Sequence, residues 1–236
     1  MRWMLWLLLI SGLGGWSARA VAVDEGPLGP GSHPETGILQ VLHRSQQTRL
    51  DRLPSAERGT PAAEVLEISV QRLIRAMGLQ QPVELRIISG DTVAETVHGN
   101  VIVANDALAA LPEGERMFIL AHELAHVVLR HWSQVGDLYQ QYIPGSVTPE
   151  KTDAVADALG RDASRMARRH EFDADAFALR TLRELGYADA HALSALSRFG
   201  FQRDSATHPG TRKRLAALCA IDEPAEIETA AIEASR

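Results

Sequence analysis

A single apolar segment with three polar residues at its centre constrains this chain more than any other feature. Ten of the thirteen residues from Met117 to Leu129 are apolar, and the other three are His122, Glu123 and His126. Burying a polar or charged group is costly unless it is paired or bound to a metal. The pattern therefore predicts a buried helix whose two histidines and one carboxylate face a common partner.

The spacing of the polar trio indicates what that partner is. In the order His-Glu-x-x-His the two histidines are four residues apart, which puts both imidazoles on one face of a helix. Converging imidazoles of this kind bind zinc, and the adjacent glutamate can act as a general base. A chance match is the alternative, but chance matches usually fall on polar surface helices. We expect one Zn²⁺ per chain, held by His122 and His126, with Glu123 as the catalytic base.

A third zinc ligand is expected in the segment 170–179, where acids alternate with apolar residues. Glu171 and Asp175 are four residues apart and share one face of a helix. Two buried carboxylates without a cation are hard to justify. Glu171 can ligate the metal, and Asp175 can accept an N–H from a ligand histidine. On the residues alone Asp173 stays a competitor, because it could face solvent or serve as the acid instead.

Hydrophobic periodicity and turn residues predict a mainly helical chain with a small sheet. The expected helices cover residues 38–53, 61–78, 112–132, 150–184, 189–200 and 211–220, and the expected strands lie within 83–89 and 92–105. The second strand region turns at Gly99, and a short helix capped by Asp106 follows it. The fold class that results is α+β, mainly α-helical, with a small sheet that precedes the buried helix in the sequence.

Residues 133–169 join the two segments that carry the predicted ligands, and we expect them to form a lid. The first part reads as a loop, and a helix break is expected at Gly160. Tyr139 and Tyr142 look exposed and could cover the zinc or grip a substrate. A loop that only packs on the surface is the alternative. The loop prediction depends on four turn-forming residues: Gly136, Pro144, Gly145 and Pro149.

The N-terminus has the features of a secretory signal peptide. Arg2 precedes an apolar stretch that is too short for a membrane span of about 20 residues, and Ala18-Arg19-Ala20 fits a cleavage site. An uncleaved anchor is the alternative. We expect export to the periplasm or the medium. The predicted division is a signal peptide at 1–20, a flexible leader and linker at 21–59, the zinc domain at 60–220 and an acidic tail at 221–236.

Composition excludes several classes of function. The net charge of −6 gives no basic footprint for nucleic acid. The basic run at 165–170 is expected to be a solvated helix face rather than a phosphate site. Cys219 is the single cysteine, so neither an internal disulfide nor a cysteine-rich zinc knuckle can form, and we expect it to be a small buried hydrophobe.

Three motifs in order resemble the gluzincin metallopeptidases of the HtpX and CAAX-prenyl-protease type. "ILAHELAHVVLRH" is similar to the active-site helix of that family, "EFDADAFAL" to its E-x-x-x-D helix, and "THPGTRKRLAAL" to its Ser/Thr-His-Pro segment, whose arginine falls on Arg214. The resemblance covers about residues 60–220. It implies a zinc-dependent endopeptidase, Glu171 as the third ligand, and a zincin-type domain whose small mixed sheet holds peptide on its edge strand.

The resemblance also suggests a setting and an alternative. Nothing after residue 20 reads as a membrane span, which favours the soluble, exported branch, whose periplasmic members act in envelope protein quality control. Expected partners are polypeptides, misfolded envelope proteins among them, with no nucleic acid; peripheral membrane contact and the oligomeric state stay open. A zinc-containing chaperone or assembly factor with latent proteolysis is the alternative, although Glu123 argues for the peptidase. Family members often carry Asn-Ala-Phe where this chain has "VAETVHG".

The remaining histidines carry weaker signals. His208 precedes Pro209 at the entry to the last helix, where it could hold the substrate or steady an oxyanion, or simply pack on a neighbour. His131 lies five residues after His126, off the ligand face, and is expected to be structural. His170 is expected to point away from the site. No pattern of candidate ligand or catalytic residues accompanies the other four histidines in the sequence, which are His33, His43, His98 and His191.

Overall fold

A computed structural model describes residues 37–57 and 59–221 of the chain. The elements are α1 (Ile38–Asp51), α2 (Pro61–Ala76), β1 (Glu84–Ile88), β2 (Ala94–Val97), β3 (Val101–Asn105), the 3-10 helix η1 (Asp106–Ala110), α3 (Glu113–Val128), α4 (His131–Tyr142), α5 (Pro149–Glu184), α6 (Ala190–Arg198) and α7 (Thr211–Ala220). The mainly helical α+β fold class is thus confirmed. The predicted signal peptide, residues 21–36 and 58 of the predicted leader and linker, and nearly all of the acidic tail lie outside the described residues. None of the described helices has the length and apolar character that crossing a membrane requires.

The sheet has three strands in the order β1–β3–β2, with β1 parallel and β2 antiparallel to β3. This confirms the small mixed sheet, and Gly99 makes the predicted turn with a positive φ of 75°. β2 is an edge strand, and its side chains alternate between two helices. Thr96 contacts Glu123 on α3, whereas Glu95 faces α1 on the other side.

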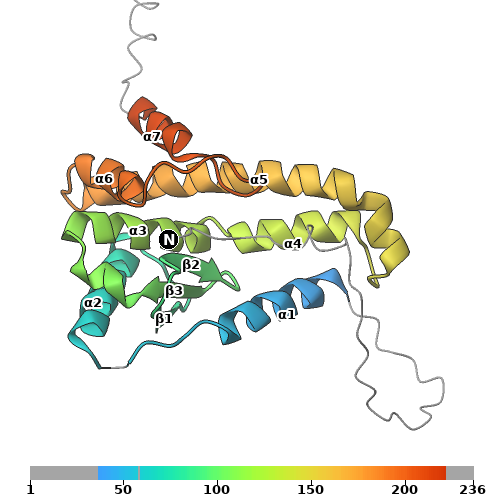
Figure 1. The fold of residues 1–236 in the computed structure, drawn as a ribbon, viewed down its shortest axis with the longest axis horizontal. Coiled ribbons are helices and arrows are strands. Elements are labelled where there is room, and N and C mark those ends of the chain that lie inside the picture. Colours follow the sequence, from blue (N-terminus) through green and yellow to red (C-terminus); the bar gives the residue numbers. More distant parts are fainter. Residues whose placement is uncertain (1–36, 58, 222–236) are drawn as a thin grey trace, which may run out of the picture.

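The helix α3 lies between the sheet and α5 (Figure 1). In that view α5 runs across the upper part of the molecule below α7, α3 and α4 form the layer beneath α5, and the sheet, α1 and α2 lie lower still. Because α3 is covered on several sides, its apolar residues fill the main core, as the sequence predicted. The largest side chains buried in this core are Leu66, Leu73, Ile102, Met117, Phe118, Leu120, Leu124, Leu179 and Leu182.

The segment predicted to be a loop is mostly helical, so that prediction is wrong. Gly136 lies inside α4, where an added Cβ would sit 3.0 Å from a methyl group of Leu39 on α1. Pro149 is the first residue of α5, a position where its missing N–H is not needed, and Thr148 caps that helix by accepting from Lys151. Gly136 and Pro149, which the sequence suggested would interrupt a helix, therefore lie at a close contact between two helices and at the start of a helix.

The segment 133–169 forms a packed helical hairpin of α4 and the first half of α5, and α5 continues without a break at Gly160. Tyr139 is only 4% exposed and packs in a second core between α1, α4 and α5. Tyr142 donates a hydrogen bond to Asp162 at 2.6 Å. Both tyrosines are used inside the hairpin, which contradicts the prediction of exposed lid aromatics.

Three smaller predictions also need correction. The buried helix ends at Val128 instead of reaching residue 132, because Arg130 adopts left-handed backbone with φ 55°. The short helix η1 is capped by Asn105, whose side chain accepts from the N–H of residue 107, and not by Asp106. Cys219 is exposed on α7 rather than buried.

Candidate metal centre

The three predicted ligands converge between α3 and α5. His122 and His126 project from one face of α3, and their Nε2 atoms are 3.2 Å apart. Each of these atoms is 3.6 Å from a carboxylate oxygen of Glu171 on α5. The three ligand atoms all lie within 4.8 Å of one another, close enough to share one ion. Two imidazole nitrogens and one carboxylate oxygen are a donor set of catalytic zinc sites, so these residues fit that metal.

An ion pair orients the first ligand. The Oδ1 atom of Asp175 is 2.9 Å from Nδ1 of His122, on the side of the ring away from the other ligands. Arg214 on α7 donates to both oxygens of Asp175, at 2.6 and 2.7 Å. Burial opposes ionisation, but the adjacent guanidinium outweighs it and lowers the pKa of Asp175 to about 2. The ionised carboxylate accepts Nδ1–H of His122 and leaves Nε2 free for the metal.

The predicted base lies beside the ligands and is held by the edge strand. The hydroxyl of Thr96 on β2 is 2.9 Å from Oε2 of Glu123 and 2.8 Å from its backbone oxygen. Burial raises the pKa of Glu123 to about 7, against the opposing effects of His122 and the Thr96 hydrogen bond. A carboxyl group with a pKa near neutrality can both accept and return a proton. Sequence reasoning missed Thr96, since a threonine in a short strand carries no distinguishing signal.

The structure also shows where His208 and Asp173 lie relative to the predicted ligands. Nε2 of His208 is 3.6 Å from Oε1 of Glu171, so this side chain lies beside the predicted ligands. Its side chain is 27% exposed, compared with 8% for His122 and 15% for His126. Asp173 instead lies 3.9 Å from Arg169 with half of its side chain exposed, so it faces solvent and is not a ligand.

Two histidines that were expected to lie apart from the ligands are next to them. Nδ1 of His131 is 2.8 Å from Nδ1 of His126. The ring of His170 stacks on His131 with centroids 3.9 Å apart and an interplanar angle of 5°. Burial lowers the pKa of His131 to about 3, so its ring is neutral at ordinary pH. The prediction that His131 lies off the ligand face is wrong, whereas His170 contacts His131 and Gln134 rather than a ligand.

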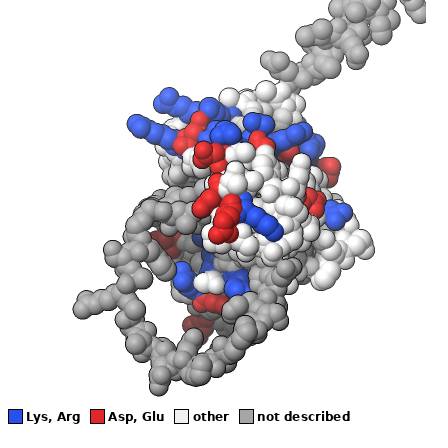
Figure 2. Space-filling model, turned by 90° about the vertical axis from the view of Figure 1, so that its right-hand side faces the viewer, with Lys and Arg blue, Asp and Glu red and all other residues white. Residues whose placement is uncertain are grey.

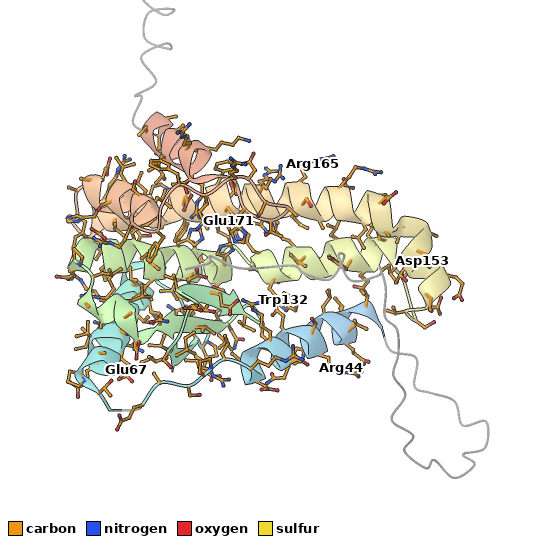
Figure 3. All side chains as sticks on the ribbon, in the orientation of Figure 1. Arg44, Glu67, Trp132, Asp153, Arg165 and Glu171 are labelled. Atoms are coloured by element: carbon orange, nitrogen blue, oxygen red, sulfur yellow. The ribbon has the colours of Figure 1, made fainter. Side chains whose placement is uncertain are left out.

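A narrow cavity of about 30 Å³ adjoins the ligands. Its wall includes Thr96, Gly99, His126, Trp132, Glu171 and Thr207. Figure 3 shows Glu171 on α5 and Trp132 at the start of α4, near the β2–β3 hairpin. A Cβ on Gly99 would lie 2.9 Å from that of Trp132, so only glycine lets the hairpin turn pack this closely. The space beside the ligands has room for water.

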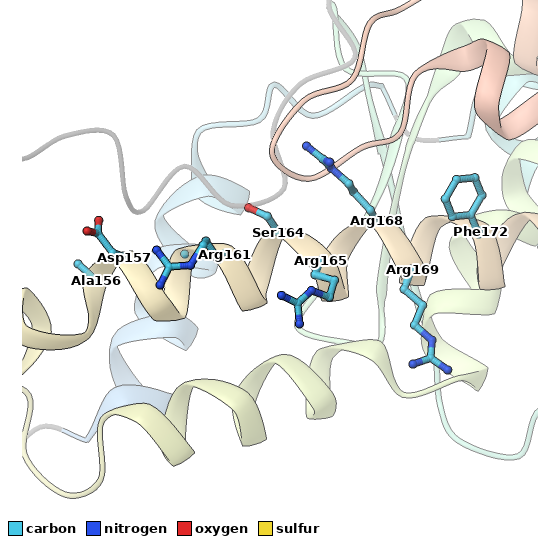
Figure 4. A pocket seen from close by; sticks show the side chains of 9 residues that line it. Ala156, Asp157, Arg161, Ser164, Arg165, Arg168, Arg169 and Phe172 are labelled. Carbon is cyan, nitrogen blue, oxygen red and sulfur yellow. The ribbon is translucent and has the colours of Figure 1, made fainter.

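A larger hollow of about 830 Å³ lies along the outer face of α5 and contains four arginines (Figure 4). Several have partners nearby: Arg168 donates to the carbonyl of Ser205 at 2.7 and 3.0 Å, and Arg165 lies 3.5 Å from Asp162. Figure 2 shows basic and acidic side chains interleaved on the end of the molecule that it faces. This surface matches the solvated helix face predicted for the basic run.

Comparison with known proteins adds one finding. The chain matches the model of Peptidase family M48 over residues 62–222. The matched segment runs from α2 to α7 and contains the ligands, the base and the residues that orient them, whereas α1 precedes it. No curated protein matches the chain.

Proposed function

Because the chain belongs to peptidase family M48 and is a metallopeptidase, we propose that it uses zinc to cleave bonds within polypeptide chains. The observation that carries the proposal is the convergence of His122, His126 and Glu171 beside the carboxyl group of Glu123. Zinc favours this mixture of imidazole and carboxylate donors, and a catalytic site leaves a further coordination position open. Family membership supports the reaction class, and the donor set supports zinc as the metal.

The division of labour in the proposed reaction follows from the contacts. Zinc, when bound, polarises the scissile carbonyl and acidifies water. Glu123 accepts a proton from the attacking water and passes it to the nitrogen of the leaving amine. Thr96 holds one oxygen of Glu123, which leaves the other free for the proton. His208, partly exposed beside the ligands, would donate to the oxyanion that develops on the substrate.

The edge strand β2 supports a site for an extended substrate. It pairs on one side with β3 and has no other described strand on its outer side. It also carries Thr96, so the outer edge runs past the catalytic base. An extended peptide added to this edge would form backbone hydrogen bonds while its scissile bond lies near the ligands.

The proposed setting is outside the cytoplasm, with misfolded envelope proteins as substrates. It is supported by the sequence of the first twenty residues, in which Arg2, a short apolar core and Ala18-Arg19-Ala20 follow one another. Mass spectrometry of the exported protein should find a mature N-terminus at or near Val21. An intact Met1 in the membrane fraction would show an anchor instead.

The change Glu123→Gln tests the proposed activity. The glutamine variant should retain zinc, because Glu123 is not a ligand, yet its cleavage of casein should fall by about 10²–10⁴-fold. Glu67→Gln, on the exposed face of α2, is the matched control and should cleave casein like the wild type. Cleavage by the Glu123 variant within a few-fold of wild type would show that another residue is the base. A zinc-loaded wild-type protein that cleaves no polypeptide would contradict the proposed function.

A further inference from the structure

We propose that His131 is a positioning residue for the metal ligand His126, brought to it by the break between α3 and α4. The proposal rests on the proposed binding of zinc by His122, His126 and Glu171. It assigns a role to two buried histidines, His131 and His170, that the reaction itself does not use. It also gives a reason for a backbone conformation that is unusual for arginine.

The helix break is what places His131 beside the ligand. On a continuous helix a residue five positions after His126 would be rotated by about 140° from it, on nearly the opposite face. Instead α3 ends at Val128, and Arg130 adopts φ 55° and ψ 37° before α4 begins. This left-handed residue redirects the chain so that Nδ1 of His131 lies 2.8 Å from Nδ1 of His126. The side chain of Arg130 itself is exposed.

The direction of the hydrogen bond follows from the other nitrogen of His126. Its Nε2 atom faces Nε2 of His122 at 3.2 Å and Glu171 at 3.6 Å, so Nε2 is the metal-binding atom. A neutral imidazole that ligates through Nε2 carries its proton on Nδ1. His126 therefore donates, and Nδ1 of His131 accepts. This contact fixes both the tautomer and the ring orientation of the ligand.

His131 is itself held by contacts that lead back to the break. Its ring stacks on His170, whose Nε2 atom lies 3.1 Å from Oε1 of Gln134. The amide nitrogen of Gln134 donates to the carbonyl of Leu129 at 2.8 Å, so its oxygen accepts from His170. His131 and His170 are each 5% exposed. The backbone carbonyl of Leu129, left free where α3 ends, thus holds Gln134, and Gln134 in turn holds the His170 ring that stacks on His131.

The test compares three variants of the protein: His131→Leu, His131→Asn and, as the control, His191→Leu. The leucine at 131 removes the acceptor, whereas the amide oxygen of asparagine can replace it. His191 lies on α6 against Gly114, away from the ligands. For each protein we would measure zinc affinity by competition with a chelator, the visible spectrum of the cobalt-substituted form, and the melting temperature without metal.

We expect His131→Leu to weaken zinc binding by about 10–100-fold and to shift the cobalt absorption bands. His131→Asn should restore the affinity to within a few-fold of wild type, and His191→Leu should bind zinc normally. Wild-type affinity and an unchanged cobalt spectrum in His131→Leu would overturn the proposal, as would equal losses in the leucine and asparagine variants. If wild type binds zinc in these assays, such results refute the positioning role alone. A wild-type chain that binds no zinc would refute the proposed function as well.

Discussion

The two sides of the metal centre orient their ligand histidines by different means. On the α7 side a buried carboxylate, Asp175, contacts His122 and is clamped by Arg214. On the α4 side a neutral histidine, His131, contacts His126 and is stacked on His170. Two ligands one helical turn apart are thus held by an ion pair on one side and by uncharged rings on the other. The difference teaches that a charge is not needed to fix a ligand, provided that the backbone delivers a suitable acceptor.

The largest predicted difference between the two sides is in stability. Asp175→Ala should lower the unfolding free energy of the metal-free protein by about 3–5 kcal/mol, because it leaves the buried guanidinium of Arg214 without its main partner. Urea denaturation measures this loss. Asp173→Ala, on the exposed face of the same helix, is the control and should change stability little. If both substitutions lowered the unfolding free energy equally, the ion pair of Asp175 with Arg214 would not be what distinguishes the α7 side from the α4 side.

A second prediction concerns the backbone on which the α4 side depends. Arg130→Val should destabilise the protein by about 1–2 kcal/mol, since a β-branched residue resists left-handed backbone. It should also weaken zinc binding, because His131 would lose its position. Arg130→Gly tolerates the same conformation and should keep wild-type zinc affinity. Chelator competition and thermal melting check both. If the glycine and valine variants had the same zinc affinity and melting temperature, the backbone conformation at residue 130 would have no influence on the metal centre.

A third prediction concerns the pH dependence of the stability that an ion pair away from the ligands, Glu115 with Arg198, contributes. Hydrogen bonds from Arg198 lower the pKa of Glu115 on α3, against the opposing effect of burial. A carboxyl group with a lowered pKa stabilises the fold above its unfolded pKa of about 4.3, and this contribution is lost as pH falls toward the folded pKa. Glu115→Gln should therefore melt below wild type at pH 7, and the gap should close in acid. Melting curves of metal-free protein test this, and a gap that stays constant with pH would contradict it.

The smallest expected effect lies further along α4, inside the hairpin. The hydroxyl of Tyr139 is buried and has no hydrogen-bond partner among the described residues. Removing it by Tyr139→Phe should change the unfolding free energy by no more than about 1 kcal/mol, and in the stabilising direction if it changes at all. Zinc affinity should stay the same. A clear loss of stability in urea would reveal a partner for this hydroxyl and a polar requirement on the α4 side.

The same two sides differ in how well the sequence predicted them. Helical spacing beside apolar neighbours pointed to His122, Glu123 and His126, and the same spacing together with the family resemblance pointed to Glu171 and Asp175. The structure brings these side chains together. His131 was not identified, because the residues around the break, "VVLRHW", include neither glycine nor proline and read as continuous helix. A spacing argument assumes an unbroken helix, so it assigned His131 to the wrong face.

The hairpin shows the opposite error. The turn-forming residues between 133 and 150 suggested a loop, whereas Gly136 is the point where α1 packs closely on α4 and Pro149 opens α5. Local sequence signals do not distinguish a glycine that ends a helix from one that admits a neighbouring helix. Thr96 escaped notice for a related reason, since its role depends on the tertiary contact of β2 with α3.

The central claim, that α3 and α5 together hold one catalytic zinc ion, is tested most directly by the metal content of the purified protein. Elemental analysis should find about one zinc per chain in the wild type and in Glu123→Gln. His126→Ala should lose the metal, because it removes one of the three converging ligand atoms. A full complement of zinc in His126→Ala, or none in the wild type after incubation with zinc, would contradict the account.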